Sequence, residues 1–149
     1  MVELRADHRA VVEQDELLGQ RVRVGDTGFA AEAAEQLAHP RAMTVAHLTK
    51  ADYEETGALE TDSEGVVDHM RAVEGTRVAV LVRELLADDR EGMRKVSLRA
   101  TDGTVDVSRI ARSFSGGGHP QAAGFSTPIP YPELVDQLRA QVREQLLQR

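Results

Sequence analysis

The residues best suited to bind a ligand lie in one short stretch, 114–125, with the sequence Phe-Ser-Gly-Gly-Gly-His-Pro-Gln-Ala-Ala-Gly-Phe. The consecutive glycines Gly116, Gly117 and Gly118 cost backbone entropy and are useful where the chain needs positive φ or close backbone approach. A run of bare amide N–H groups beside a helix start forms an anion-binding nest. His119 follows directly, and its side chain donates to a phosphate or hydroxyl near neutral pH. The stretch therefore predicts a pocket for a phosphate-bearing ligand, such as the end of a short RNA or a nucleotide.

The distribution of charge supports this prediction. Residues 94–124, which contain the glycine run, hold five basic and two acidic side chains, a net charge of +3. Residues 50–75 hold two basic and eight acidic side chains, a net charge of −6. The alternative interpretations are a flexible loop with a single surface histidine and ordinary scatter of surface charge. The coincidence of the basic stretch with the glycines favours a bound anion.

The composition is that of a folded protein of about one ordinary domain, with 149 residues, 41% of them hydrophobic and 29% charged. The net charge of −7 argues against a non-specific binder of duplex DNA, which needs a broad basic face. Cysteine is absent, which excludes disulfides, thiolate nucleophiles and Cys-based zinc sites and makes a reducing cytoplasm the expected location. No apolar run approaches the roughly 18 residues that span a bilayer, so no membrane partner is expected.

The elements that must position the glycine run are readable in the C-terminal two thirds of the chain. Residues 43–48 have the pattern of a strand, and the helix after them has Thr49 as its N-cap and Gly57 as its stop. Thr61 and Glu64 predict a capping box for a second helix. A hairpin is expected next, because a nearly continuous Val/Leu run and an alternating segment are joined by a charged turn.

The alternating segment, residues 95–100, contributes two further candidate ligand-binding residues. Strict alternation places Ser97 and Arg99 on one face of the strand, with the hydrophobic residues on the other. An exposed strand position without a ligand is the alternative interpretation of Arg99.

The remaining elements surround the glycine run. Asp106 is a suitable N-cap for a helix that ends just before the glycines, and residues 123–127 are expected to form a strand. The small residues at 121–123 can open a short helix and let backbone or ligand approach. Pro132 suits the first turn of a final amphipathic helix. The order β-α-α-β-β-α-loop-β-α predicts an α/β or α+β fold, a mixed β-sheet with flanking helices.

The motif at 113–125 closely resembles the signature of the DHH-associated domain. That is the C-terminal domain of DHH-family phosphoesterases, especially the bacterial oligoribonucleases (nanoRNases) that also act on 3′-phosphoadenosine 5′-phosphate. Further segments that resemble the family follow in the family's order: 48–52, 61–68, 73–75, 78–84, 95–99 and 105–111. The resemblance covers about residues 42–148.

The resemblance implies a division of labour. In the family, an N-terminal domain with an Asp-His-His triplet carries a two-manganese site, and the C-terminal domain holds the substrate end. By the family pattern, Arg99 and Ser97 contact the substrate phosphate or sugar, and the loop at 116–119 wraps the terminal nucleotide with His119 near the scissile phosphate. This sequence contains no Asp-x-Asp and no Asp-His-His. We therefore expect no metal or cofactor in this chain, Mn²⁺ on a separate catalytic domain, and no hydrolysis by this chain alone.

Residues 1–41 are harder to interpret than the remainder. We expect a poorly defined N-terminal region there, either a linker or a catalytic-domain remnant, and a DHH-associated substrate-binding domain at 42–149. Within the N-terminal region, the hydrophobic residues of 11–18 suggest a helix, 21–24 alternate like a short strand, and 30–37 are rich in Ala and Glu and suggest a helix.

Three functions remain open at this point. The chain is the substrate-binding half of an oligoribonuclease and phosphatase, or a free-standing module for a nucleotide or short RNA. The third alternative is a tRNA-binding or dimerisation domain of the alanyl-tRNA synthetase type. The expected partners are the short RNA or nucleotide ligand and a DHH catalytic domain, with a homodimer as an open alternative.

Overall fold

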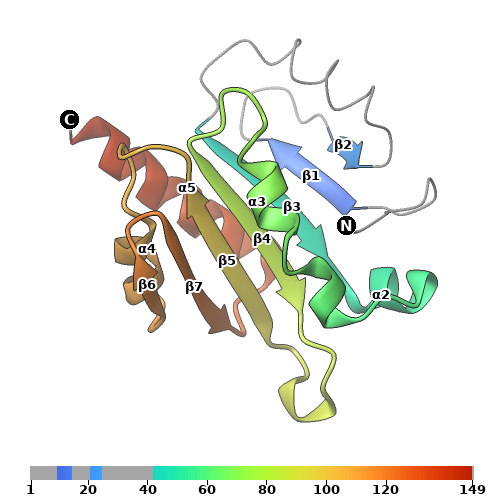
Figure 1. Cartoon of the computed structure of the whole chain (residues 1–149). Coiled ribbons are helices and arrows are strands. Elements are labelled where there is room, and N and C mark those ends of the chain that lie inside the picture. Colours follow the sequence, from blue (N-terminus) through green and yellow to red (C-terminus); the bar gives the residue numbers. More distant parts are fainter. Residues whose placement is uncertain (1–9, 15–20, 25–41, 149) are drawn as a thin grey trace.

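A computed structural model describes residues 10–14, 21–24 and 42–148, whose strands form one seven-stranded sheet in the order β2-β1-β3-β4-β5-β7-β6 (Figure 1). The strands are β1 (Ala10–Gln14), β2 (Arg21–Val24), β3 (Met43–Leu48), β4 (Val78–Glu84), β5 (Arg94–Ala100), β6 (Gly117–His119) and β7 (Ala122–Thr127). The helices are α2 (Lys50–Thr56), η1 (Glu60–Ser63), α3 (Val66–Met70), η2 (Asp88–Arg90), α4 (Val107–Ser113) and α5 (Tyr131–Leu147).

The sheet is mixed, as the sequence predicts. β3 and β4 run parallel and are joined by the crossover through α2, η1 and α3, whereas the other neighbouring strands are antiparallel. The hairpin of β4 and β5 is confirmed, with Val80 opposite Leu98. The α/β fold class is therefore confirmed.

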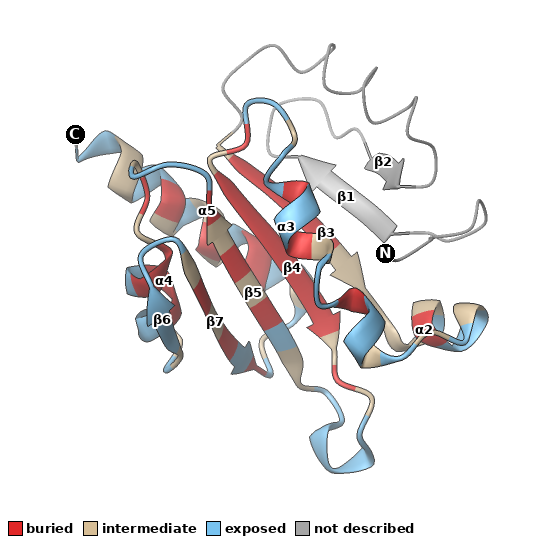
Figure 2. Ribbon diagram, in the orientation of Figure 1, coloured by how far each residue is buried: buried red, intermediate tan, exposed pale blue. Residues whose placement is uncertain are grey.

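β4 lies at the centre of the sheet and is buried on both faces, with only its last residue partly exposed. Val78, Val80 and Val82 belong to one hydrophobic cluster, together with residues of α4 and α5. Ala79 and Leu81 belong to a second, smaller cluster with residues of α3. The continuous Val/Leu run in the sequence thus reflects a strand covered on both sides (Figure 2).

The helices cover the two faces unequally. α4 and α5 pack on one face, where Ile110, Leu134 and Leu138 are fully buried. On the opposite face α3 lies over β3 and β4, with Val67 and Met70 against Leu81, and it leaves much of β5 and β7 without a covering helix (Figure 1). We refer to the part of this face formed by β5, β7 and β6 as the open face.

The predicted cap at Thr49 is confirmed, and the one at Thr61 is wrong. The Thr49 side chain accepts from the Asp52 N–H, the Asp52 carboxylate accepts from the Thr49 N–H, and Gly57 ends α2 at φ 67°. Thr61 instead lies inside η1, which begins where the Asp62 carboxylate accepts from the Leu59 N–H at 2.7 Å. This bond starts the turn two residues early, so α3 begins after Gly65 with no side-chain cap.

The helix expected near Val11 is also wrong, because residues 10–14 form strand β1. The strand pairs antiparallel with β3, with Val12 opposite Ala46. Pairing within the sheet therefore outweighs the local hydrophobic pattern that suggested a helix. The strand expected at 21–24 is confirmed as β2. Residues 15–18 and the helix expected at 30–37 lie outside the described residues.

The final helix, α5, forms as predicted, with Pro132 in its first turn. Leu134, Leu138 and Val142 are buried and follow a spacing of four residues, which makes a seam against the sheet. Among the described residues, the structure has no helix with the length and hydrophobicity that crossing a membrane requires.

Candidate functional site

The strand register brings the predicted site residues together in two adjacent rows across the open face. In one row Ser97 of β5 lies opposite Gly124 of β7, which lies opposite Gly117 of β6. Directly opposite residues of paired strands project to the same face of a sheet. Ser97 and Gly117 therefore share a face, although β7 separates their strands.

The second row is formed by Arg99, Ala122 and His119 in the same three strands. Neighbouring strands are about 4.8 Å apart, so the backbones of Arg99 and His119 are roughly 10 Å apart, with only a small alanine side chain between them. The side chains of Arg99 and His119 therefore project from the same face of the sheet, two strands apart.

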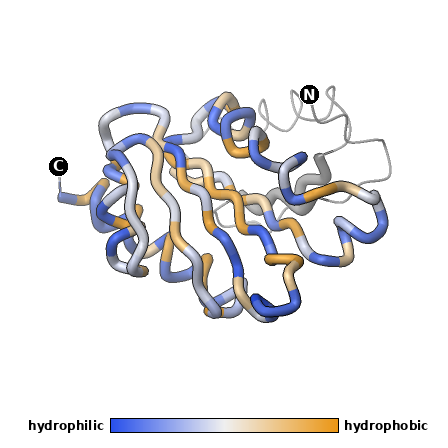
Figure 3. Tube along the Cα trace, turned by 60° about the horizontal axis from the view of Figure 1, so that its bottom comes forward, coloured by the Kyte–Doolittle hydropathy of each residue, from blue (hydrophilic) through white to orange (hydrophobic). Residues whose placement is uncertain are grey.

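The open face is accessible where these residues lie. Val96 and Leu98 are fully buried on the other side of β5, whereas Ser97 and Arg99 are partly exposed. Gly117 and His119 are exposed, and Ala122 and Gly124 are partly exposed. Figure 3 shows the hydropathy along the chain, and residues 95–100 of β5 alternate between hydrophilic and hydrophobic. The predicted division of β5 into a core face and a polar face is therefore confirmed.

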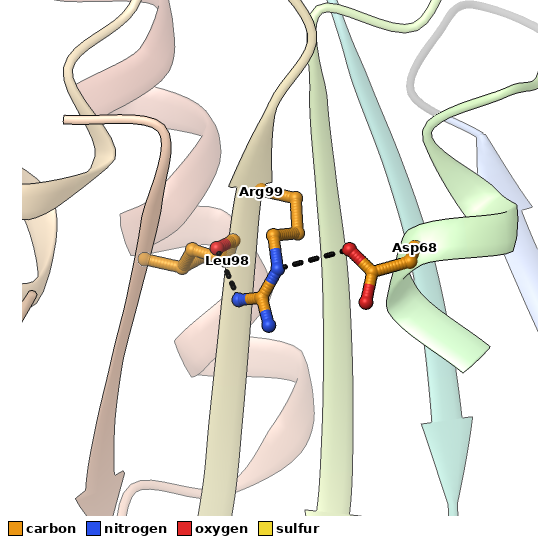
Figure 4. Close-up of polar contacts among 3 residues, drawn as sticks. All are labelled: Asp68, Leu98 and Arg99. Carbon is orange, nitrogen blue, oxygen red and sulfur yellow. Dashed lines mark hydrogen bonds and ion pairs between the residues drawn. The ribbon is translucent and has the colours of Figure 1, made fainter. Parts of the chain in front are cut away.

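The Arg99 guanidinium is oriented by two contacts. Its Nε donates to the Asp68 carboxylate of α3 at 3.1 Å, and its Nη1 donates to the Leu98 carbonyl oxygen at 3.0 Å (Figure 4). The side chains of Arg99 and Asp68 are 25% and 51% exposed, so the ion pair is worth at most about 1 kcal/mol. Of the five guanidinium N–H groups, the remaining three make no hydrogen bond to the residues that the structure describes, and they can bind an oxyanion.

The glycine run forms an edge strand rather than the loop that the sequence predicts. Gly117 and His119 belong to β6, which pairs with β7 and has no further strand of the described sheet on its outer side. The short helix expected to open at 121–123 is wrong, because β7 already begins at Ala122. Small residues there allow the two strands to lie close together.

Close approach to β7 explains two of the three glycines. A Cβ on Gly116 would collide with the Gly124 carbonyl oxygen and with Cβ of Phe125. A Cβ on Gly118, whose φ is 140°, would lie 2.5 Å from the carbonyl oxygen of Ala122. A Cβ on Gly117 would meet nothing within 4 Å, because it would project from the open face.

Backbone hydrogen bonds anchor the glycine strand to its neighbours. The Gly116 N–H donates to the Ala111 carbonyl oxygen at the end of α4, at 2.8 Å. At the other end of the strand, the Pro120 carbonyl oxygen accepts from the Val107 N–H, at 2.9 Å. The strand therefore spans the length of α4 and is held at both ends of that helix.

The N-terminus of α4 is fixed in turn by Asp106, the predicted N-cap. Its carboxylate accepts from the Ser108 hydroxyl at 2.6 Å, from the Ser108 N–H at 2.9 Å and from the Arg109 N–H at 3.3 Å. The Ser108 hydroxyl, followed by the two backbone donors and the charge of Arg112, holds the pKa of Asp106 below its ordinary value of 3.8 against the opposing effect of burial. Gln145 of α5 holds the Asp106 backbone through both its N–H and its carbonyl oxygen.

Sequence reasoning missed Asp68, which is the only described side chain that pairs with Arg99. The signal available was its position in the polar half of a helix whose Val67 and Met70 are buried. That pattern indicates an exposed carboxylate, but it does not indicate which strand the carboxylate meets.

The arrangement can bind an anion, and no metal site accompanies it in the described part of the chain. Among those residues, no group of three or more His, Cys, Asp or Glu side chains is placed to hold a metal ion. The groups available in the two rows are a guanidinium, an imidazole, a hydroxyl and the glycine backbone.

The fold defines an α/β domain with a mixed sheet and one partly uncovered face, and comparison with known proteins gives its family. The DHHA1 domain matches residues 42–148, so the chain belongs to the DHHA1 domain family. It is 36% identical over 100 residues to the bifunctional oligoribonuclease and PAP phosphatase NrnA of Thermus thermophilus. That match covers 66% of this chain but only 29% of the relative's length.

The fold is also found in a solved structure of an exopolyphosphatase-related protein from Bacteroides fragilis. The two share 24% sequence identity with a TM-score of 0.59, over 68% of this chain and 28% of the other. A further similar structure is the C-Ala domain of alanyl-tRNA synthetase from Aquifex aeolicus, with 13% identity and a TM-score of 0.49 over 67% of this chain and 91% of that domain.

Proposed function

We propose that the open face holds the phosphate-bearing end of a short RNA or of a nucleotide such as 3′-phosphoadenosine 5′-phosphate. The observation that carries the proposal is the register that places Ser97 with Gly117 in one row and Arg99 with His119 in the next. A guanidinium with free N–H groups, a hydroxyl and an imidazole then share one accessible face of the sheet.

The residues have different roles in this proposal. Arg99 binds the phosphate through its unused N–H groups, and Ser97 and His119 donate to phosphate or sugar oxygens. Gly117 presents bare backbone to the ligand, since nothing occupies the space above it. Gly116 and Gly118 act indirectly, because they let β6 approach β7.

We further propose that a DHH-type domain with Mn²⁺ hydrolyses the phosphodiester or phosphomonoester that this face holds. The match to the Thermus thermophilus oligoribonuclease and phosphatase supports this assignment, together with membership of the DHHA1 family. Two metal ions would activate water and stabilise the leaving oxygen, while the face described here would position the substrate.

The test is a titration of isotope-labelled chain with 3′-phosphoadenosine 5′-phosphate and with a dinucleotide, followed through the backbone amides by NMR. The expected result is saturable shifts at Ser97, Arg99 and residues 116–119, with little change in α5 on the opposite face. Shifts confined to α5, or none at millimolar ligand, would contradict the proposal.

A further inference from the structure

Asp68 is the acidic residue that the fold places directly beside Arg99, the residue that we propose binds the phosphate. Val67 and Met70 anchor α3 to the sheet, and this packing fixes the carboxylate at 3.1 Å from the Arg99 Nε. Glu64, an acidic residue four positions earlier, is exposed and makes no hydrogen bond or ion pair with Arg99.

The contact determines which part of the guanidinium is free. Nε is directed at Asp68, and one N–H of Nη1 is used by the Leu98 carbonyl oxygen, so the free donors are on the Nη atoms (Figure 4). A phosphate can therefore bind through the free N–H groups of Nη1 and Nη2 but not through Nε. Its oxygens then lie within several ångströms of a carboxylate that carries the opposite charge to the arginine.

This geometry has a consequence for the charge of the ligand. Arg99 and Asp68 together are close to neutral, and the next cation on this face of β5 is Lys95, about 13 Å away along the strand at 3.3 Å per residue. A singly charged phosphodiester is attracted by the nearby guanidinium and only weakly repelled by the carboxylate. A doubly charged terminal phosphate experiences twice the attraction and twice the repulsion, so the carboxylate weakens the binding of the terminal phosphate more than that of the diester.

We propose that Asp68 is a specificity-determining residue that reduces the preference of the Arg99 subsite for a doubly charged terminal phosphate over a singly charged phosphodiester. The inference rests on the proposed function, since it requires that a phosphate bind at Arg99. Asp68 acts by orienting Arg99 and by placing its own negative charge near the ligand, and it does not itself bind the ligand.

The experiment compares adenosine 3′-monophosphate with its methyl ester, which differ in charge but share the nucleoside. Titrations at pH 8, well above the second phosphate pKa of about 6, keep the monoester doubly charged. Each ligand is titrated into the wild-type chain and into Asp68→Asn, which keeps an oxygen acceptor for the Arg99 Nε but removes the charge. Glu64→Gln is the matched control, because it changes net charge equally in an exposed residue that makes no hydrogen bond or ion pair with Arg99.

Asp68→Asn is expected to raise the affinity for the monoester relative to the diester by about threefold or more, the order expected for one unit charge in a half-exposed setting. The ratio should stay at the wild-type value in Glu64→Gln, and the effect of Asp68→Asn should shrink at 0.5 M salt. A purely structural role of Asp68 would change both affinities by the same factor and leave the ratio unchanged.

The outcomes separate this inference from the proposed function. In the first case both ligands bind and Arg99→Ala weakens both, but Asp68→Asn leaves the ratio of the two affinities unchanged. The role of Asp68 is then overturned, and the proposed binding of phosphate to the open face stands. If neither ligand binds the wild-type chain, or if Arg99→Ala changes nothing, the proposed function is overturned and the role of Asp68 with it.

Discussion

Ser97 of β5 and Gly117 of β6 face the same glycine, Gly124 of β7, from opposite sides. A Cβ on Gly124 would lie 2.8 Å from the Val96 carbonyl oxygen, so a side chain at this position would disturb β5. The middle strand of the open face therefore carries almost no side-chain bulk between the hydroxyl of Ser97 and the exposed backbone of β6.

Gly117 and Gly118 should differ sharply in their tolerance of alanine. Gly118→Ala should lower the free energy of unfolding by about 2 kcal/mol or more, because φ 140° disfavours an L-residue and the new Cβ meets backbone at 2.5 Å. Gly117→Ala should cost about 1 kcal/mol or less, since its Cβ meets nothing. Urea unfolding followed by circular dichroism measures both, and equal losses would show that close strand approach is not the reason for the glycines.

Arg99→Ala should weaken binding of 3′-phosphoadenosine 5′-phosphate by about tenfold to a hundredfold, which corresponds to the roughly 1.5–3 kcal/mol of a charge-assisted hydrogen bond. His119→Ala should also weaken binding, because it removes an imidazole donor from the same row. Arg109→Ala is the control for the loss of a positive charge, since Arg109 is an exposed residue of α4 on the other face of the sheet. Calorimetry gives the affinities, and wild-type values for both Arg99→Ala and His119→Ala would remove these residues from the site.

The purified chain supplemented with Mn²⁺ should not release mononucleotides from a short RNA. The reason is that two-metal hydrolysis requires carboxylates or histidines that hold both ions, and we assign these to the DHH-type domain. Chromatography of the reaction mixture detects the products. Turnover that persists through repurification and disappears in Arg99→Ala would show that this chain catalyses the reaction itself.

Asp106→Ala should destabilise the chain by about 1 kcal/mol at pH 7, because it removes the N-cap of α4. The folded-state pKa of Asp106 lies below its ordinary value, so the stabilisation is fully present above about pH 4 and is lost as the pH falls through the folded-state pKa. Asp106→Asn is the control, because asparagine caps a helix about as well but does not titrate. Thermal unfolding between pH 3 and pH 7 should show a pH-dependent gap between wild type and Asp106→Ala, and a constant gap would contradict the role of the charge.

The elements that the sequence predicted well have their determining interactions within a few residues. Strict alternation between Lys95 and Ala100 indicates both that β5 is a strand and which side chains face the core. The pattern is clear because helices cover mainly one face of β5. Asp106 and Thr49 cap helices through hydrogen bonds that span two or three residues. Ser97 and Arg99 could therefore be placed on one face before any tertiary structure was known.

The features that the sequence did not predict depend on contacts between distant segments. Asp68 and Arg99 are 31 positions apart and meet only because α3 packs on the sheet. Glycine has no hydropathy pattern, so the pairing of β6 with β7 left no periodic signal at 116–118. The cap at Thr61 failed because Asp62 makes the competing bond to Leu59.

Because Gly116 and Gly118 pack closely against β7, a triple glycine in another protein with this sheet is evidence for the strand geometry and not, by itself, for ligand binding. The two flanking positions admit one amino acid because of backbone geometry alone, so they would persist in a descendant that had lost its ligand entirely. No close backbone contact restricts the residue type at positions 97, 99 and 119, so these residues could change once the ligand was lost. Retention of the serine, arginine and histidine, rather than of the glycines, is therefore the better marker by which to separate binding domains from those that keep only the scaffold.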